Sequence, residues 1–221
     1  MGLRRPLKFK LAVLLFLQVE NQAFFSRLIQ AMATQEGRYA IEPYSVWNDE
    51  SEITPKMATL LISDVFDLPW SDRSLLGEVV KRIEKDLVDD EEARLDLEKT
   101  ERLLTSRLMS LSAGLSADYT FGIEWDLGRI LKMLGFYVDA MPGYKLIDNL
   151  ITFLSLALDS KCQKILIFVN LKTFLTKNEL KLFYEHVFYT GAHVVLFENK
   201  QDNNNYQHER KYTVDQDFLE Y

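Results

Sequence analysis

Three acidic side chains, Asp118, Glu124 and Asp126, lie close together in the sequence, around the start of a helix expected over residues 124–134. Hard cations such as Ca²⁺ take several carboxylate and carbonyl oxygens, often from a loop beside a helix end. The spacing of the three acids does not match an EF-hand loop. Two interpretations therefore stay open: a metal site, or the negative charge that the dipole of a helix favours at its N-terminus.

The segment after the first expected strand lacks the chemistry of a phosphate-binding loop. Such a loop needs closely spaced glycines, so that backbone N–H groups can approach the phosphates, together with a Lys and a Ser or Thr. Residues 19–24 read VENQAF, without a glycine, and no G-x-G-x-x-G occurs anywhere. Asn170 occupies the position after Phe168-Val169 where an acid that holds magnesium is expected, and Asp64 is the only competitor. The sequence therefore predicts no bound nucleotide.

Hydrolase motifs are also missing. The three histidines, His186, His193 and His208, form no H-x-x-x-H or H-E-x-x-H pattern, and no G-x-S-x-G occurs. Cys162 is the only cysteine, which excludes an internal disulfide and the Cys-based zinc patterns and predicts a reduced structural thiol. We predict a protein without catalytic activity.

Composition describes an ordinary folded protein: 221 residues, 48% hydrophobic and 27% charged. The net charge of −7 argues against a protein that coats nucleic acid with its whole surface, but it allows basic residues gathered on one wall. No segment approaches the ~20 apolar residues of a membrane span. The short apolar run at 11–17 is interpreted as a strand rather than a signal peptide, so we expect a cytoplasmic location and no membrane partner.

The hydrophobic pattern predicts the elements that position these side chains. Apolar runs at about 8–19, 58–65, 165–169 and 194–197 predict buried strands. The last two, with the helix between them, form a βαβ unit of a parallel sheet. Helices are expected at 21–37, over much of 71–115, at 124–134 and at 146–158, and a polar loop is expected at 199–211.

These elements predict an α/β fold. Residues 1–70 and 160–221 form a discontinuous head domain on a mostly parallel sheet. The insertion 71–159 forms a helical leg domain.

Four short motifs carry a family resemblance: Lys164–Asn170 (KILIFVN), Phe174–Lys177 (FLTK), Glu179-Leu180 and Val195–Glu198 (VLFE). Together they resemble the CRISPR-associated ring protein of type II-A systems, the small non-catalytic member of the spacer-acquisition module. Weaker similarity at residues 19–29, 61–65 and 131–135 extends the resemblance over nearly the whole chain. These are packing motifs, so they specify the fold more firmly than the activity.

The resemblance implies a head like a degenerate P-loop domain and a helical leg. It implies a homotetrameric ring with a positively charged central hole, which binds double-stranded DNA without sequence preference and favours free ends. It also implies calcium near the junction of head and leg, which makes Asp118, Glu124 and Asp126 the candidate ligands. The implied partners are the CRISPR integrase and the effector nuclease of the same system.

Candidate DNA contacts follow from the resemblance and depart from the family pattern. The loop that is usually basic before the third strand carries Asp49, Glu50 and Glu52 here, and only Lys56 lies nearby. Other lysines and arginines must then supply the wall of the hole. The candidates for phosphate contact are Arg4, Arg5, Lys8, Lys10, Lys56, Lys172 and Lys177.

Two alternatives stay open. A protein-interaction scaffold of the same module, without DNA binding, would explain the acidic balance and the missing basic loop. A divergent nucleotide hydrolase that uses Asp64 is the second.

Overall fold

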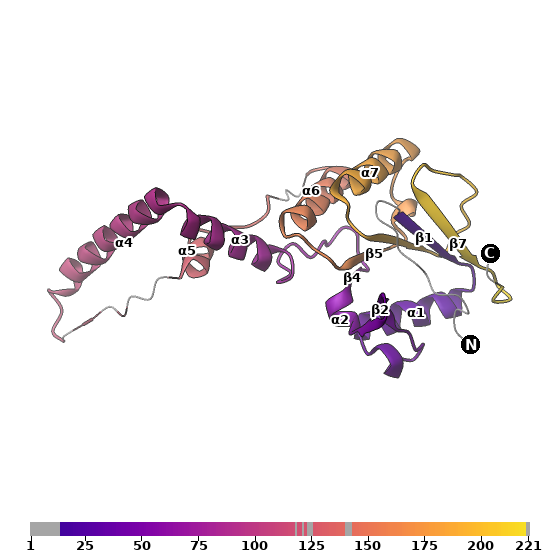
Figure 1. Ribbon diagram of the computed structural model, residues 1–221, viewed down its shortest axis with the longest axis horizontal. Helices are drawn as coiled ribbons and strands as arrows, with labels where there is room; N and C mark the ends of the chain where they lie inside the picture. Colours follow the sequence, from indigo (N-terminus) through magenta and orange to yellow (C-terminus); the bar gives the residue numbers. More distant parts are fainter. Residues whose placement is uncertain (1–13, 118, 121, 123–125, 140–142, 220–221) are drawn as a thin grey trace. The chain divides into compact units, whose positions relative to one another are not determined.

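The computed structural model describes residues 14–117, 119–120, 122, 126–139 and 143–219. The chain divides into two compact units, a head (Met1–Trp70 with Asp139–Tyr221) and a leg (Ser71–Val138). The second boundary therefore lies about twenty residues before the predicted one at 159/160. The reason is helix α6 (Leu146–Asp159), which packs against helix α7 (Lys177–Thr190) and so belongs to the head (Figure 1).

A five-stranded sheet forms the centre of the head. Its strand order is β4-β5-β6-β1-β7, and every neighbouring pair is parallel, which confirms the predicted α/β class. The strands are β1 (Leu14–Val19), β4 (Thr59–Ile62), β5 (Ile165–Val169), β6 (Val194–Glu198) and β7 (Glu209–Val214). Strand β7 begins inside the segment that we predicted as a polar loop.

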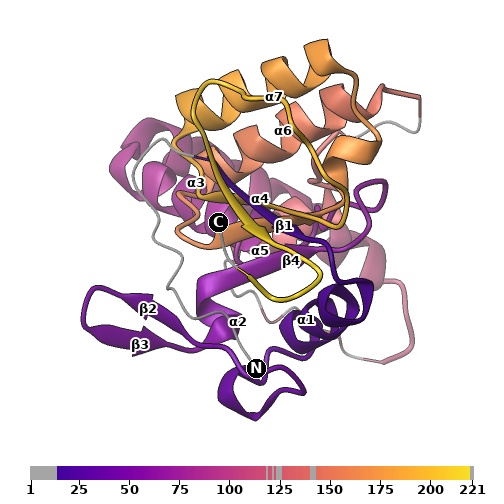
Figure 2. The ribbon, with the colours of Figure 1, turned by 90° about the vertical axis from the view of Figure 1, so that its right-hand side faces the viewer.

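Helices cover both faces of this sheet. Helix α1 (Gln22–Thr34) lies on one face, and α6 and α7 lie on the other (Figures 1 and 2). Because side chains alternate along a strand, Leu15, Leu17 and Val19 of β1 join the α1 layer, and Phe16 points to the opposite face.

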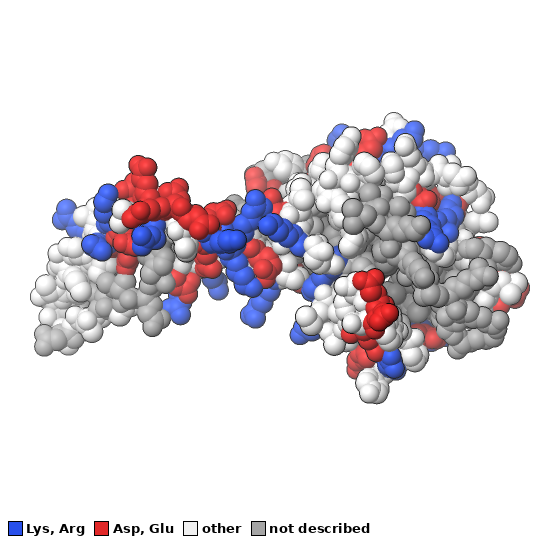
Figure 3. Space-filling model, in the orientation of Figure 1, with Lys and Arg blue, Asp and Glu red and all other residues white. Residues whose placement is uncertain are grey.

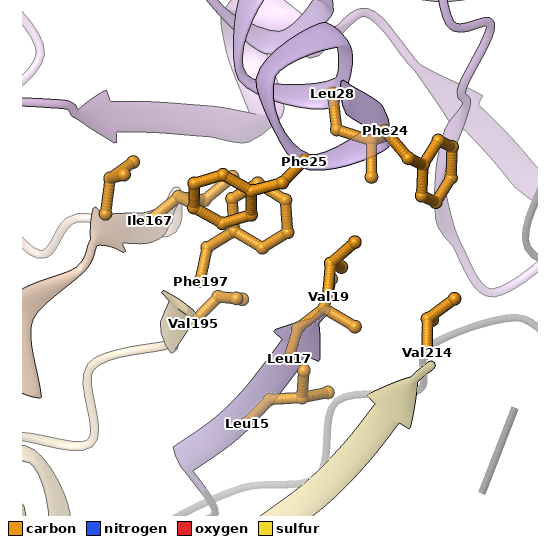
Figure 4. Packing of buried hydrophobic residues seen from close by; sticks show 11 residues of the cluster. Leu15, Leu17, Val19, Phe24, Phe25, Leu28, Ile167, Val195, Phe197 and Val214 are labelled. Atoms are coloured by element: carbon orange, nitrogen blue, oxygen red, sulfur yellow. The ribbon is translucent and has the colours of Figure 1, made fainter. Parts of the chain in front are cut away.

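The α1 layer is a cluster of buried apolar side chains (Figure 4). Phe25 of α1 stacks on Phe197 of β6 with ring centroids 4.6 Å apart, and Phe24 meets Phe218 edge to face. Each fully buried side chain of this kind contributes roughly 1.5–3 kcal/mol. This burial fixes α1, and hence the end of β1, against the sheet.

A small excursion joins α1 to β4. It contains the 3-10 helix η1 (Gly37–Tyr39), an antiparallel hairpin of β2 (Val46–Asn48) and β3 (Ser51–Ile53), and helix α2 (Pro55–Ala58). The hairpin projects from the rest of the head in Figure 2. Its acidic end is anchored by the ion pair of Arg38 with Glu52, at 2.6 Å.

The leg consists of α3 (Leu76–Asp89), α4 (Glu91–Ser112) and α5 (Leu127–Met133). Asp90 ends α3 and starts α4, since its side chain accepts the N–H of Ala93 at 3.0 Å. Figure 3 shows acidic side chains gathered over the junction of α3 and α4. Among the described residues, no helix is long and apolar enough to cross a membrane.

Candidate nucleic-acid interface

Lys172 lies in the short 3-10 helix η2 (Leu171–Thr173), directly after β5, and its side chain turns inward. Its ammonium donates to Asp202 Oδ2 at 2.7 Å and to Glu209 Oε2 at 2.8 Å, and it lies 3.8 Å from the centroid of the Phe16 ring. Only 9% of this side chain is exposed. Two carboxylates therefore already neutralise the Lys172 ammonium inside the head. We do not propose Lys172 as a DNA contact for this reason.

The Lys172 cluster also holds the segment 199–208, which joins β6 to β7. Hydrogen bonds from Lys172 and Asn204 outweigh the burial that would raise the pKa of Asp202, so this pKa lies below its usual value. Lys211 donates to two backbone carbonyls of the same segment, those of Asp202 and Asn204. The Asp202 N–H donates to Gln18 Oε1 at 3.2 Å, which ties the segment to the end of β1.

Two further groups in this cluster titrate abnormally. Glu198 is 2% exposed, and burial raises its pKa to about 7, although its Oε1 accepts the backbone N–H of Lys172 at 2.9 Å. Burial, and then the Glu209 carboxylate, raise the pKa of Tyr184, whose hydroxyl donates to Glu209 Oε2 at 2.5 Å. Both shifts arise because charge is costly in this buried pocket of polar groups.

The other predicted cations have different locations. Lys177 is exposed at the first position of α7, and Lys56 is exposed in α2. Neither makes an ion pair with any described residue. Arg4, Arg5, Lys8 and Lys10 lie outside the described residues.

The fold brings two more lysines beside Lys177 that the sequence did not single out. Helices α6 and α7 each precede a strand of the parallel pair β5 and β6, so both begin where the strands end. Lys145 precedes α6 and lies near enough to Glu179 of α7 to contribute to the lowering of the pKa of that carboxyl, behind the Thr176 hydrogen bonds. Lys181 follows Lys177 by one helical turn on the same face. All three lysines are exposed at this end of the head.

The equivalent of a phosphate-loop site is closed by the chain itself. Helix α1 begins directly after β1, but the Asn21 side chain accepts the N–H of Phe24 at 3.0 Å and donates to the carbonyl of Gln216. Asp64 accepts the N–H of Phe66 at 2.8 Å, which organises the turn after β4. The polar groups that a nucleotide site would use therefore satisfy the local backbone.

The predicted metal region is described only in part, because Asp118 and Glu124 lie outside the described residues. Asp126 caps α5: its Oδ1 accepts the N–H of Arg129 at 2.9 Å, and its Oδ2 lies 3.0 Å from Arg129 Nε. Where the chain is described, no three His, Cys, Asp or Glu side chains converge as metal ligands. Asp126, the candidate ligand that lies within the described residues, therefore caps a helix, and the calcium site stays a prediction.

Comparison with known proteins identifies the family of this chain. The family model for the CRISPR-associated protein Cas_Csn2 matches residues 43–218. The chain belongs to the Cas_Csn2 family. The Cas_Csn2 match runs from the excursion after α1, through the leg, to the tail after β7.

Solved structures agree with the Cas_Csn2 fold. The crystal structure of Stu0660 of Streptococcus thermophilus superposes with a TM-score of 0.61 at 14% identity, covering 93% of this chain and 70% of that chain. At that identity the likeness shows the fold alone. The search of curated proteins found no match.

Proposed function

We propose that this chain is a non-catalytic protein of CRISPR spacer acquisition that binds the ends of double-stranded DNA as a homotetrameric ring. Membership of the Cas_Csn2 family is the observation that carries the proposal. Its working partners would be the integrase and the effector nuclease of the same type II-A system. Lysines and arginines of the central hole would contact phosphates, so binding would be independent of sequence and steeply dependent on salt.

The exposed cations of the head support phosphate contact. Lys56 and Lys177 are exposed and make no ion pair with a described residue, so they can approach a phosphate without breaking an existing interaction. Lys145 and Lys181 extend the Lys177 position into a group of three. Arg4, Arg5, Lys8 and Lys10 complete the proposed set from outside the described residues.

The closed N-terminus of α1 supports the absence of nucleotide chemistry. Asn21 fills the position at which a phosphate would accept backbone N–H groups, and no glycine lies between Val19 and Phe24. We also propose that Asp118 and Glu124 are ligands of calcium, and the assay measures DNA binding with and without this ion.

Helix α4 supports self-association. Leu97, Leu104, Leu108 and Leu111 recur at intervals of three, four and seven residues, the spacing of a helix–helix seam, and no residue of α4 is buried within the chain. Leu104 is 52% exposed and Leu111 is 77% exposed. An apolar stripe of this kind is typical of an interface between subunits.

The test compares linear with closed-circular duplex DNA in a mobility-shift assay, with and without calcium, on protein whose mass is fixed by light scattering. The proposal expects a tetramer that shifts linear DNA and releases it as salt is raised. A monomer or dimer that shifts neither DNA at low salt would refute it. That result would favour the scaffold hypothesis, which the acidic β2–β3 hairpin and the net charge of −7 support.

A further inference from the structure

The excursion between α1 and β4, residues 37–58, exposes four large apolar side chains. Tyr39 is 93% exposed, Met57 is 72% exposed and Trp47 is 53% exposed, and Ile41 is exposed as well. A single exposed apolar residue is ordinary, but several in one short projecting segment are typical of a contact surface (Figure 2). The excursion therefore carries apolar surface that the head does not use for its own packing.

The pairing of the β2–β3 hairpin turns Trp47 away from the head. In the register of the two strands, Val46 lies opposite Ile53, and Trp47 lies opposite Glu52. Because side chains alternate along a strand, these two pairs point to opposite faces. Val46 and Ile53 are half-buried, so their face is the inner one. Trp47 and Glu52 share the outer face, and both are exposed.

Two local interactions fix the outer face of the hairpin. Arg38 of η1 donates from Nε and Nη2 to the two carboxylate oxygens of Glu52, at 2.7 and 2.6 Å. The Trp47 Nε1–H donates to Ser45 Oγ at 2.9 Å, which satisfies the one polar group of the indole. A surface that is already ordered loses less conformational entropy when a partner binds.

The charge that remains on the hairpin is negative. The excursion has four carboxylates and two cations, and two of the carboxylates are already paired, with Arg27 and with Arg38. The other two, Asp49 and Glu50, lie at the turn of the hairpin, are exposed and make no ion pair with a described residue. The remaining cation, Lys56, lies in α2. Figure 3 shows acidic side chains on this part of the head. The turn therefore repels phosphates and attracts cations.

We propose that the outer face of the β2–β3 hairpin binds an arginine-containing segment of a partner protein. One guanidinium would lie over the Trp47 indole, and neighbouring arginines would pair with Asp49 and Glu50. Trp is the side chain whose ring attracts a cation most strongly, and Arg is the cation found there most often. Arg also binds a carboxylate through two parallel hydrogen bonds, as Arg38 does with Glu52. The inference goes beyond the proposed function, because it stands whether or not the chain binds DNA.

Nucleic acid is the other occupant to test, because exposed aromatic rings also stack on bases. The two free carboxylates at the turn argue against it, since they would face the phosphates that flank a stacked base. The two occupants predict opposite results for one variant. Removing the carboxylates of Asp49 and Glu50 weakens the binding of a basic segment and strengthens the binding of nucleic acid.

The probes are short labelled peptides, which are titrated with the full chain and followed by fluorescence anisotropy. One peptide alternates Arg with Ala, the second alternates Lys with Ala, and the third alternates Glu with Ala. Single-stranded and duplex DNA are titrated in parallel. The native protein is expected to bind the Arg peptide about threefold to tenfold more tightly than the Lys peptide, and not to bind the Glu peptide.

A substitution of the ring tests the cation–π contact. Trp47→Ala should weaken binding of the Arg peptide about threefold to tenfold, the range expected for a cation over an exposed or partly desolvated indole. The control is Tyr189→Ala, which removes another exposed ring, from the end of α7, and should leave the affinity within about twofold. In protein labelled with 5-fluorotryptophan, the ¹⁹F signal that Trp47→Phe removes should shift with the Arg peptide, and the signals of the other two tryptophans should not.

A substitution of the acids tests the charge contact. Asp49→Asn with Glu50→Gln should weaken binding of the Arg peptide about threefold to tenfold, as expected for two exposed ion pairs. Asp89→Asn with Glu92→Gln removes the same charge from exposed positions of the leg, so it is the matched control for attraction by net charge. This control should change the affinity by less than about twofold. Circular dichroism checks that each variant keeps its fold.

The inference is overturned if the native protein binds no Arg peptide. It is also overturned if the hairpin variants weaken the Arg peptide no more than their controls do, because net charge alone would then explain binding. A Trp47→Ala variant that loses DNA affinity while it keeps the Arg peptide would assign the hairpin to nucleic acid and would equally overturn it. If the native protein binds the Arg peptide at the hairpin but no DNA, the proposed function fails and this inference stands.

Discussion

Replacing Glu198 by Gln is expected to remove a pH dependence from the stability of the head. Glu198 ends β6 with 2% of its surface exposed, and burial raises its pKa from 4.5 to about 7. Between about pH 4.5 and pH 7, the folded protein therefore keeps a proton on Glu198 that the unfolded chain has released. The amide introduced by Glu198→Gln would be neutral like the protonated acid, and its oxygen could still accept the Lys172 N–H.

The sign and size follow from linkage. Because the folded-state pKa is raised, the stability that Glu198 contributes is complete below about pH 4.5 and is lost as pH rises through about 7. The shift from 4.5 to about 7, at about 1.36 kcal/mol per pH unit, corresponds to about 3 kcal/mol. Asp202 acts in the opposite direction, but only at lower pH, because its pKa lies below 3.8.

The assay is urea unfolding at a series of pH values from about 4.5 to 8, followed by circular dichroism and by tryptophan fluorescence, to which Trp70, packed against Phe153, contributes. Protein concentration is held constant, because self-association would add to stability. Relative to the native chain, Glu198→Gln should gain about 3 kcal/mol of unfolding free energy across this range. Glu185→Gln, which removes an exposed carboxylate from α7, is the matched control.

A constant difference between Glu198→Gln and the native chain over this range would refute the reasoning. So would a difference of opposite slope. An opposite slope would mean that the Lys172 ammonium stabilises ionised Glu198 by more than burial destabilises it, whereas a constant difference would mean that the two effects balance.

Three more predictions follow from packing and charge. Lys172→Met should lower the unfolding free energy by about 3–5 kcal/mol, because it removes the buried ammonium that pairs with Asp202 and Glu209; an unchanged urea midpoint would contradict the buried cluster. Phe197→Ala should cost about 3–5 kcal/mol in the same assay, and a loss below about 1 kcal/mol would mean that the α1 layer repacks. Leu104→Glu with Leu111→Glu on α4 should lower the assembly mass in light scattering without changing helix content, and an unchanged mass would remove the α4 stripe from the subunit interface.

Much of the head could be predicted because its strands are buried on both faces. Strand β5 is an unbroken apolar run, and β6 is apolar up to its last residue, Glu198. The helix between them begins with a capping box at Thr176 and Glu179. In such segments local propensity and burial favour the same structure. The sequence therefore indicated the βαβ unit, the parallel sheet and the family.

Strand β7 could not be predicted, because its pattern is polar. Glu209 and Lys211 belong to an edge strand whose charges are satisfied by partners elsewhere in the chain, Lys172 for Glu209 and the 199–208 segment for Lys211. The periodicity of hydrophobic residues indicates a strand that is buried among apolar side chains, but it does not indicate a strand whose charged side chains are buried in ion pairs. The same ion pairs explain why Lys172 resembled a surface lysine in sequence.

The edge of the head that carries the candidate site was predictable only in its parts. Lys177 was singled out by its place after β5, but Lys145 lies in a segment expected to belong to the leg. Phe66 and Phe174 are over a hundred positions apart in sequence, and only the pairing of β4 with β5 brings their turns together. The spacing of residues in the sequence does not reveal that these two turns lie next to each other.

The strand order has a consequence for synthesis. Strand β1 is made first, but its sheet partners are β6 and β7, which are completed only at Val214. During synthesis on the ribosome, β1 therefore has no sheet partner, and the apolar face of α1 stays uncovered, until the whole leg has been translated. The leg contains mainly local contacts and can fold early, whereas closure of the head is a late event with high contact order. A chain released before Val194 would expose Leu15, Leu17 and Phe25 to chaperones and proteases.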